Sequence, residues 1–168
     1  MPANLPDQSI LLPMSDKTET NSFAIAIDGP AASGKSTVAR RLAERLGLIM
    51  INTGAMYRAI AWATLKKKVD VSDPEAVVAM LGEIAVTCGV KDGESTILID
   101  GIDPGDALRE DQVNARVSQV AALPEIRELL VAKQREYLKL GSLVMEGRDI
   151  GSVVFPDTPY KLYIDASE

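Results

Sequence analysis

Residues 29–36 carry the clearest chemical pattern in this chain. Their sequence, Gly-Pro-Ala-Ala-Ser-Gly-Lys-Ser, fits the phosphate-loop pattern G-x-x-x-x-G-K-[ST]. In such a loop, backbone N–H groups and the N-terminus of the next helix bind phosphate oxygens. The pattern predicts that the ammonium group of Lys35 reaches the β- and γ-phosphates of a nucleoside triphosphate and that the Ser36 hydroxyl binds Mg²⁺.

The sequence on either side of this loop has the order that such a site requires. An apolar run at residues 23–27 predicts a buried strand before the loop. Val38, Leu42 and Leu46 recur at helical spacing and predict a helix after it, which runs to Gly47. The alternative, a glycine-rich turn that only caps a helix, does not explain this context. The phosphate-binding residues we expect are Gly29, Pro30, Ala31, Ala32, Ser33, Gly34, Lys35, Ser36 and Thr37.

A second group of polar residues opens the helix expected after a strand at residues 48–51. Tyr57 and Arg58 lie there, and in a parallel sheet ligands bind at the carboxyl ends of the strands. The planar fork of an arginine matches phosphate oxygens. The alternatives are a solvated helix charge for Arg58 and half-buried packing for Tyr57.

A third group follows an apolar run at residues 143–145. Glu146 stands where many phosphate-loop proteins hold Mg²⁺ or its waters, so we expect Glu146 and Ser36 to form the metal site. Arg148 and Asp149 follow between two glycines, which would let the backbone approach a ligand. A polar loop with a salt bridge is the alternative for this segment.

These segments predict an α/β fold of the P-loop NTPase type, with a parallel sheet and flanking helices. Residues 84–90 and 96–102, joined by a polar turn at residues 91–95, indicate a hairpin and so a small antiparallel β insert. The strands we expect in the main sheet are residues 23–28, 48–51, 143–145 and 160–164. The helices we expect are residues 35–47, 55–68, a short helix starting at 72–74, 110–121 and 124–140, with a turn at 52–54.

The expected domains are a core of residues 23–69 and 106–168 and an insert of residues 70–105. Residues 1–22 are rich in Pro, Ser, Thr and Asp and predict a disordered tail, with Met14 as a second candidate start. No apolar run approaches the roughly 20 residues of a membrane span.

Composition narrows the chemistry. The net charge of −6 argues against nucleic-acid binding, which needs a basic face. The absence of histidine excludes His-based metal sites and Ser-His-Asp chemistry. The one cysteine, Cys88, cannot form an intrachain disulfide, and we expect it to be a buried small hydrophobe. Together these features favour a reducing cytoplasm.

Four separate blocks of the sequence also resemble one enzyme family. Residues 26–37, 52–58, 116–127 and 146–156 closely resemble bacterial cytidylate kinases, in the family's order. The expected hairpin is similar to that family's enlarged nucleoside-monophosphate domain, and the resemblance extends over about residues 23–168.

The resemblance implies transfer of the ATP γ-phosphate to CMP or dCMP, with ATP and Mg²⁺ at the phosphate loop. It implies a catalytic set of Lys35, Arg58 and Arg148, in which the two arginines hold the acceptor phosphate. The implied substrate-binding residues are Thr53, Tyr57, Arg58, Ser118, Arg127, Arg148 and Asp149. A nucleotide-binding fragment without efficient turnover and a small-metabolite kinase on the same scaffold are the alternatives. We expect a monomer.

The chain also departs from the family pattern. Family members continue past the equivalent of residues 165–168, into a lid that carries arginines and a last strand and helix. Glu110 and Asp111 follow Arg109 where the family tends to have Thr and Pro. Because lid arginines stabilise transition-state charge, the expectation for this chain is poor folding alone or nucleotide binding without efficient turnover.

Overall fold

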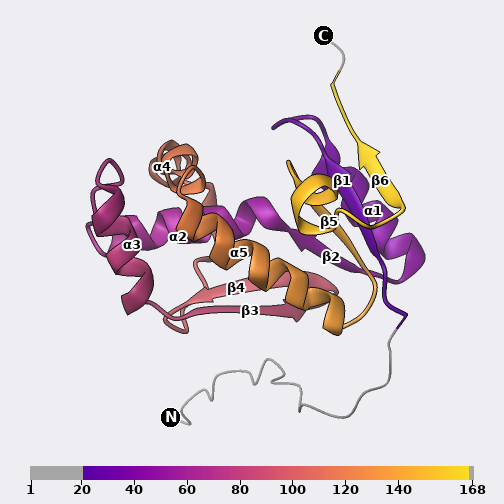
Figure 1. The fold of residues 1–168 in the computed structure, drawn as a ribbon, viewed down its shortest axis with the longest axis horizontal. Coiled ribbons are helices and arrows are strands. Elements are labelled where there is room, and N and C mark those ends of the chain that lie inside the picture. Colours follow the sequence, from indigo (N-terminus) through magenta and orange to yellow (C-terminus); the bar gives the residue numbers. More distant parts are fainter. Residues whose placement is uncertain (1–20, 167–168) are drawn as a thin grey trace.

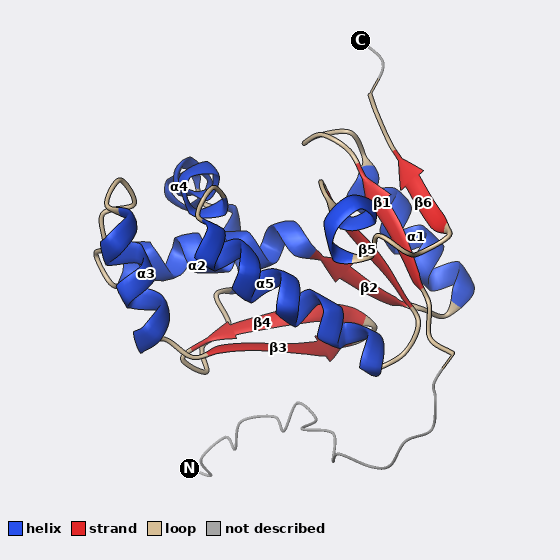
Figure 2. Ribbon diagram, in the orientation of Figure 1, coloured by secondary structure: helices blue, strands red, loops and turns tan. Residues whose placement is uncertain are grey.

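The computed structural model describes residues 21–166 of the chain. The tail expected for residues 1–22 therefore lies outside the described residues, apart from its last two positions. Figures 1 and 2 show that the strands form one sheet with helices packed on it, which confirms the predicted α/β class.

Six strands form this sheet in the order β3-β4-β2-β5-β1-β6. Neighbouring strands are parallel except for the antiparallel pair β3 and β4. The carboxyl ends of β1, β2, β5 and β6 therefore lie at one edge of the sheet, which is where such folds bind ligands. The strands are β1 (Ala24–Asp28), β2 (Ile49–Asn52), β3 (Val86–Lys91), β4 (Glu94–Ile99), β5 (Leu143–Gly147) and β6 (Tyr160–Tyr163).

Five α-helices and three shorter helical turns connect the strands within residues 21–166. The α-helices are α1 (Lys35–Leu46), α2 (Thr53–Lys66), α3 (Pro74–Glu83), α4 (Asp111–Ala121) and α5 (Pro124–Glu136). The short turns are η1 (Gly105–Arg109), η2 (Tyr137–Lys139) and η3 (Ile150–Val154), the last with π-helical hydrogen bonding. None of the helices in this part of the chain is both long and apolar enough to cross a membrane.

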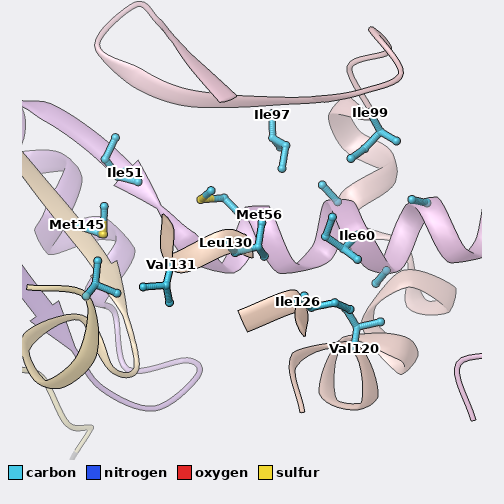
Figure 3. Packing of buried hydrophobic residues seen from close by; sticks show 14 of the residues in the cluster. Ile51, Met56, Ile60, Ile97, Ile99, Val120, Ile126, Leu130, Val131 and Met145 are labelled. Carbon is cyan, nitrogen blue, oxygen red and sulfur yellow. The ribbon is translucent and has the colours of Figure 1, made fainter. Parts of the chain in front are cut away.

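The central strands bury both of their faces, which explains why they read as continuous apolar runs. In β1, Ile25 and Ile27 pack with α1 on one face, while Ala24 and Ala26 belong to the larger core on the other. That larger core lies between the hairpin and helices α2, α4 and α5. Figure 3 shows Met56 of α2 among these layers.

The predicted helix α1 is confirmed, and of the three apolar residues that predicted it, Leu42 packs against the core on the sheet. Ala39 and Ala43 are buried against the sheet, whereas Val38 and Leu46 are 41% and 53% exposed. Small alanine side chains let the helix axis approach the strands closely. Gly47 ends the helix in a left-handed conformation, as predicted.

Two local predictions also differ from the structure. Thr53 and Gly54 belong to α2 rather than to a turn, because the Asn52 side chain accepts a hydrogen bond from the backbone N–H of Ala55 and caps the helix. The hairpin turns over two residues, Asp92 and Gly93, both with positive φ, so β3 and β4 reach closer to the turn than expected. At their other ends the strands are two to three residues shorter than the expected 84–90 and 96–102.

The hairpin is continuous with the main sheet. The N–H of Met50 donates to the carbonyl of Gly93 at 2.8 Å, and β2 pairs with β4 at Met50 and Glu94. Arg40 of α1 forms an ion pair with Glu94 at 2.7 Å, which ties the same end of the hairpin to the phosphate-loop helix. Cys88 of β3 is half-buried rather than fully buried.

Candidate functional site

The loop at residues 29–36 leaves β1 and leads into α1, which confirms the predicted strand-loop-helix order. Gly34, directly before the helix, has a left-handed φ of 83°. The Lys35 Nζ donates to the carbonyl of Pro30 at 2.9 Å, so this ammonium group lies across the loop that it follows. The Ser33 hydroxyl is buried and has no hydrogen-bond partner among the described residues.

Position 29 must be glycine because the backbone that follows β6 leaves no room for a side chain there. Its φ is 157°, and a Cβ at this position would lie 2.0 Å from the carbonyl oxygen of Ile164. The backbone N–H of Ile164 in turn donates to the carbonyl of Asp28 at 2.8 Å. The start of the loop is therefore held against the end of β6.

Glu146 joins the loop to the end of β5. Its carboxylate accepts a hydrogen bond from the Ser36 hydroxyl at 2.7 Å, and its backbone carbonyl accepts one from the Thr53 hydroxyl, also at 2.7 Å. The residue is 4% exposed, and its second carboxylate oxygen has no hydrogen-bond partner among residues 21–166. Ser36 and Glu146, the predicted metal-binding pair, are thus in direct contact. The second carboxylate oxygen of Glu146 stays available to bind a ligand.

Arg58 lies beside this carboxylate. Its guanidinium folds over the first turn of α2, where a Cβ at Gly54 would lie 3.2 Å from Nη1. Burial lowers the pKa of Arg58 from its usual value, the charge of Glu146 opposes that shift, and the charge of Arg109 adds to it. The charges of Glu146, at β5, and of Arg109, at the end of η1, therefore both act on Arg58.

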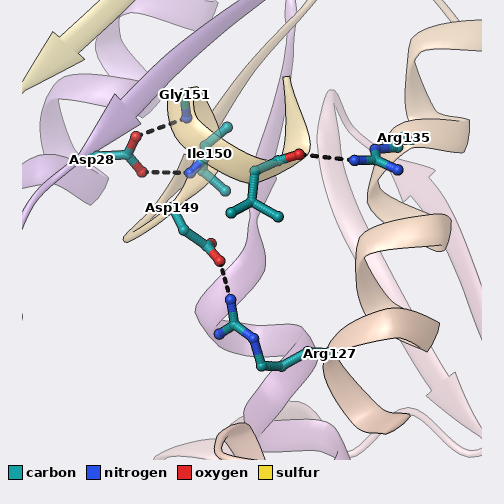
Figure 4. Close-up of polar contacts among 7 residues, drawn as sticks. Asp28, Arg127, Arg135, Asp149, Ile150 and Gly151 are labelled. Carbon is teal, nitrogen blue, oxygen red and sulfur yellow. Dashed lines mark hydrogen bonds and ion pairs between the residues drawn. The ribbon is translucent and has the colours of Figure 1, made fainter. Parts of the chain in front are cut away.

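Asp149 and Arg127 form an ion pair beyond the end of β5, with Nη2 of the arginine 2.5 Å from Oδ2 of the aspartate. Figure 4 shows the two side chains directed toward each other from α5 and the loop after β5. The side chains remain 42% and 26% exposed, so the pair is accessible to a ligand. Tyr57 is half-buried nearby: burial and the charge of Asp149 raise the pKa of its hydroxyl, while Arg127 lowers it.

Asp28 was missed in the sequence analysis. Its Oδ1 accepts from the N–H of Ile150 at 2.8 Å and its Oδ2 from the N–H of Gly151 at 2.9 Å (Figure 4). Asp28, which directly precedes the phosphate loop, is therefore hydrogen-bonded to the segment that follows Asp149. The available signal was an acidic side chain at the end of an otherwise apolar strand.

Gln134 and Arg109 were also missed. Gln134 is 1% exposed on α5, and its amide nitrogen is buried without a hydrogen-bond partner among residues 21–166. It follows Arg127 by seven residues, which is two helical turns, so both lie on one face of the helix. That spacing was a usable signal. Arg109 had no comparable signal, because only the fold of η1 against α2 brings its charge to Arg58.

Three of the predicted site residues are exposed. Ser118 is exposed on α4, and Arg148 is exposed in the loop after β5. Within residues 21–166 neither side chain makes a hydrogen bond or ion pair with another predicted site residue. Thr37 is exposed in the first turn of α1.

The two glycines around Arg148 also lie close to other parts of the protein. A Cβ at Gly147 would lie 2.6 Å from the Thr53 hydroxyl, and one at Gly151 would lie 3.1 Å from the Lys161 side chain. Close packing against Thr53 is therefore by itself a reason for glycine at position 147, whereas the flexible Lys161 side chain constrains position 151 less.

The arrangement has two chemically distinct parts at one edge of the sheet. One combines a glycine loop, an ammonium group, a hydroxyl and a buried carboxylate, and is suited to a polyphosphate with a cation. The other combines a carboxylate with a guanidinium, and is suited to a planar ligand with both donors and acceptors. The Arg58 guanidinium lies near the first part, on the helix that also carries Tyr57 of the second.

Comparison with known proteins shows the family to which the chain belongs. A model of the cytidylate kinase family matches residues 25–168. A cytidylate kinase of Rhodococcus opacus (strain B4) is 45% identical over 149 residues, which are 88% of this chain and 65% of that protein. A cytidylate kinase of Streptococcus mutans serotype c is 43% identical over 145 residues, which are 85% of this chain and 64% of that protein.

A longer relative shares the same segment. A bifunctional pantoate ligase/cytidylate kinase of Synechococcus sp. (strain WH7803) is 46% identical over 149 residues, which are 88% of this chain and 30% of that protein. The chain thus spans at most about 65% of the length of these relatives. Since the family model covers most of its length and the relatives exceed 40% identity, the chain belongs to the cytidylate kinase family.

Proposed function

We propose that this protein binds ATP with Mg²⁺ and transfers the γ-phosphate to CMP or dCMP. The observation that carries the proposal is the position of two complementary sites at one edge of the sheet. Ser36 and Glu146 meet at the phosphate loop, and Arg127 and Asp149 meet beyond the end of β5. Membership of the cytidylate kinase family supports the same assignment.

Residues 29–37 would hold the donor nucleotide. The loop amides and the N-terminus of α1 provide hydrogen-bond donors and partial positive charge for its phosphates. The Lys35 ammonium, which contacts the carbonyl of Pro30, lies within this loop and would neutralise charge on the β- and γ-phosphates. The buried Ser33 hydroxyl offers a further polar group to the same ligand.

Mg²⁺ fits the residues that are present. It prefers oxygen ligands and usually binds one or two carboxylates together with substrate phosphates and water. The unpaired buried oxygen of Glu146 and the Ser36 hydroxyl are such ligands. Within residues 21–166 no group of three or more acidic or cysteine side chains could hold a metal alone, so phosphate oxygens would complete the site. Bound there, Mg²⁺ would neutralise phosphate charge.

The acceptor base would lie at Asp149 and Arg127. Cytosine has an amino donor at position 4 and acceptors at N3 and O2, so the carboxylate can accept from the amine and the guanidinium can donate to the ring. Uracil exchanges donors and acceptors at positions 3 and 4 and would leave polar groups unpaired, which a site of this kind rejects strongly. Thr53, Tyr57 and Ser118 would complete this side, with Thr53 acting through its bond to Glu146.

Chemistry at this site needs positioning and charge neutralisation more than proton transfer. The attacking phosphate oxygen of a nucleoside monophosphate is already anionic, so no strong general base is required, in agreement with a chain that has no histidine. Arg58 and Arg148 would hold the acceptor phosphate, and Lys35 would balance the charge that develops on the donor.

We further propose that residues 70–105 form the insert that helps hold the monophosphate, and that the protein acts as a monomer in the cytoplasm. The hairpin strand β4 packs in the core against α2, the helix that carries Tyr57 and Arg58, and this supports a role of the insert in shaping the acceptor side.

Calorimetry on this chain with CMP, dCMP, UMP and ATP–Mg²⁺, beside an assay for CDP, tests the proposal. We expect binding of ATP and of CMP or dCMP, with UMP much weaker. Asp149→Ala should weaken CMP far more than ATP, and Asp157→Ala, an exposed loop variant, should change neither. Equal loss of both nucleotides in Asp149→Ala would contradict the assignment. If both nucleotides bind but no CDP is formed, the chain is a nucleotide-binding fragment instead. If ATP binds but CMP, dCMP and UMP are not distinguished, a small-metabolite kinase is favoured.

A further inference from the structure

The start of α2 is held by hydrogen bonds from two different strands. The Thr53 hydroxyl donates to the carbonyl of Glu146 in β5 at 2.7 Å. The backbone N–H of Asn52 donates to the side-chain hydroxyl of Ser95 in β4 at 3.1 Å. Asn52 and Ser95 are both half-buried, and β2 leads directly from Asn52 into α2 (Figure 1). The Ser95 hydroxyl therefore links the hairpin to the first residues of α2.

A side chain makes this link because the backbone pairing of the two strands is short. β2 and β4 pair at Met50 and Glu94, where the N–H of Met50 donates to the carbonyl of Gly93 at 2.8 Å. Two residues further along β2, the N–H of Asn52 meets the Ser95 hydroxyl. Because a partly buried N–H without a partner costs free energy, a residue without a hydroxyl at position 95 would weaken the hold on Asn52.

Asn52 in turn caps α2 and lies close to the Arg58 guanidinium. Its side-chain oxygen accepts from the N–H of Ala55 at 3.1 Å, which fixes the first turn of the helix. A Cβ at Gly54 would lie 3.3 Å from this same oxygen and 3.2 Å from Nη1 of Arg58. The cap and the guanidinium therefore border one small space over the first turn of α2. A shift of Asn52 would move the turn on which the guanidinium packs.

We propose that Ser95 is a positioning residue for the acceptor phosphate, which acts through Asn52 on the first turn of α2 and so on Arg58. The inference rests on the proposed function, because it assumes that Arg58 holds the phosphate of the nucleoside monophosphate. An arginine binds phosphate oxygens through a planar fork, so its affinity depends on where its helix places it. The hairpin thus contributes to acceptor binding through a hydrogen bond within the sheet.

Ser95→Thr and Ser95→Val form a matched pair, because their side chains have nearly the same shape and only threonine keeps the hydroxyl. Both are β-branched and suit a strand. We expect Ser95→Thr to bind CMP as the wild type does, and Ser95→Val to bind it about three- to tenfold more weakly, as for one lost hydrogen bond. The affinity for ATP–Mg²⁺ should be equal in all three proteins. Calorimetry measures both affinities.

Cytidine separates positioning from general damage, because it has the base and sugar of CMP without the phosphate. Its affinity should be the same in Ser95→Thr and Ser95→Val, since the expected loss concerns the contact of Arg58 with phosphate. Thr64→Val is the control for lost stability, because the Thr64 hydroxyl is buried in α2 and donates to the carbonyl of Ala61 at 2.7 Å. It should lower the unfolding temperature and leave CMP affinity unchanged.

A second readout follows the link in the protein without nucleotide. The backbone amides of Asn52 and Ala55 should exchange hydrogen faster in Ser95→Val than in Ser95→Thr, because the start of α2 is held less firmly. Ser95→Ala takes the place of Ser95→Val if the valine variant does not fold.

Equal CMP affinities in Ser95→Thr and Ser95→Val would overturn the positioning role, whatever the exchange rates. Equal losses of cytidine and CMP affinity in Ser95→Val would overturn it as well, because the effect would then not concern the phosphate. A wild-type chain that binds no CMP would instead overturn the proposed function, and with it the role of Ser95.

Discussion

The carboxylate of Asp28, at the end of β1, accepts a hydrogen bond from the backbone N–H of Ile150, the first residue of η3, at 2.8 Å, although the two residues are 122 positions apart in sequence. A second bond reaches Gly151 at 2.9 Å. Because Asp28 immediately precedes the phosphate loop and Asp149 immediately precedes Ile150, one side chain sets the spacing between the donor and acceptor sides of the site.

Removal of this carboxylate should therefore affect both stability and acceptor binding. In Asp28→Ala two buried N–H groups lose their partner, and we expect about 1–3 kcal/mol of stability to be lost together with roughly tenfold weaker CMP binding. Urea unfolding and calorimetry measure the two effects. Asp73→Ala is the control, because Asp73 caps α3 through the N–H of Ala76. It should lose stability without any change in CMP affinity. Equal CMP affinity in Asp28→Ala and wild type would show that this link does not position Asp149.

Lys35→Ala should abolish detectable ATP binding while the protein stays folded. Among the residues that the structure describes, the ammonium group donates one hydrogen bond, to the carbonyl of Pro30, and because this bond is exposed its loss costs little stability. Its charge, by contrast, faces the phosphates directly. Isothermal calorimetry with ATP–Mg²⁺ measures the effect. Arg41→Ala, on the exposed side of the same helix, controls for a simple change of net charge. Retained ATP affinity in Lys35→Ala would place the triphosphate elsewhere.

Glu146→Gln should remove most of the gain in ATP affinity that Mg²⁺ provides. The amide oxygen can still accept from the Ser36 hydroxyl, so the local structure is kept, but the charge that a hard cation requires is lost. The measurement is the ratio of ATP affinities with and without Mg²⁺, in the variant and in the wild type. Glu136→Gln, an exposed position on α5, should leave this ratio unchanged. A ratio that is equally large in Glu146→Gln would argue that another carboxylate holds the metal.

The stabilisation that the buried Tyr137 provides should be lost at alkaline pH. Its hydroxyl lies 3.0 Å from the carbonyl of Gly89 and 3.2 Å from that of Thr96, and burial raises its pKa above the usual value of about 10. A raised pKa in the folded state means that the stabilisation is complete below pH 10. It is lost at higher pH, where the unfolded chain ionises and the folded one does not.

Two variants separate this effect from the other alkaline titrations. Tyr137→Phe should lose about 1 kcal/mol at pH 8 through its hydrogen bonds, and its free energy of unfolding should fall less steeply than that of the wild type between pH 9.5 and 11. Tyr163→Phe, which is 71% exposed, should follow the wild type at every pH. Parallel curves for Tyr137→Phe and wild type would exclude Tyr137 as the titrating group. Urea unfolding at several pH values supplies the data.

Local patterns predicted the elements around the phosphate loop well. Strand β1, helix α1 with its Gly47 cap, and the contact between Ser36 and Glu146 all follow from spacing and residue type. The residues that revealed α1 do not all pack on the sheet: Leu42 does, whereas Val38 and Leu46 are largely exposed. The side chains fully buried there are the small Ala39 and Ala43. Helical periodicity shows that a face exists, and it does not show which side chains fit the neighbouring layer.

The sequence by itself determined the α/β class, the phosphate loop and the family, because glycines, a lysine and apolar runs act over a few residues and leave a readable pattern. Only the tertiary structure decided that Asp28 holds the segment after β5, that η1 packs on α2, and that Gln134 of α5 is buried. These contacts join residues on different strands and helices. Their energies depend on burial and distance, which no local sequence pattern records.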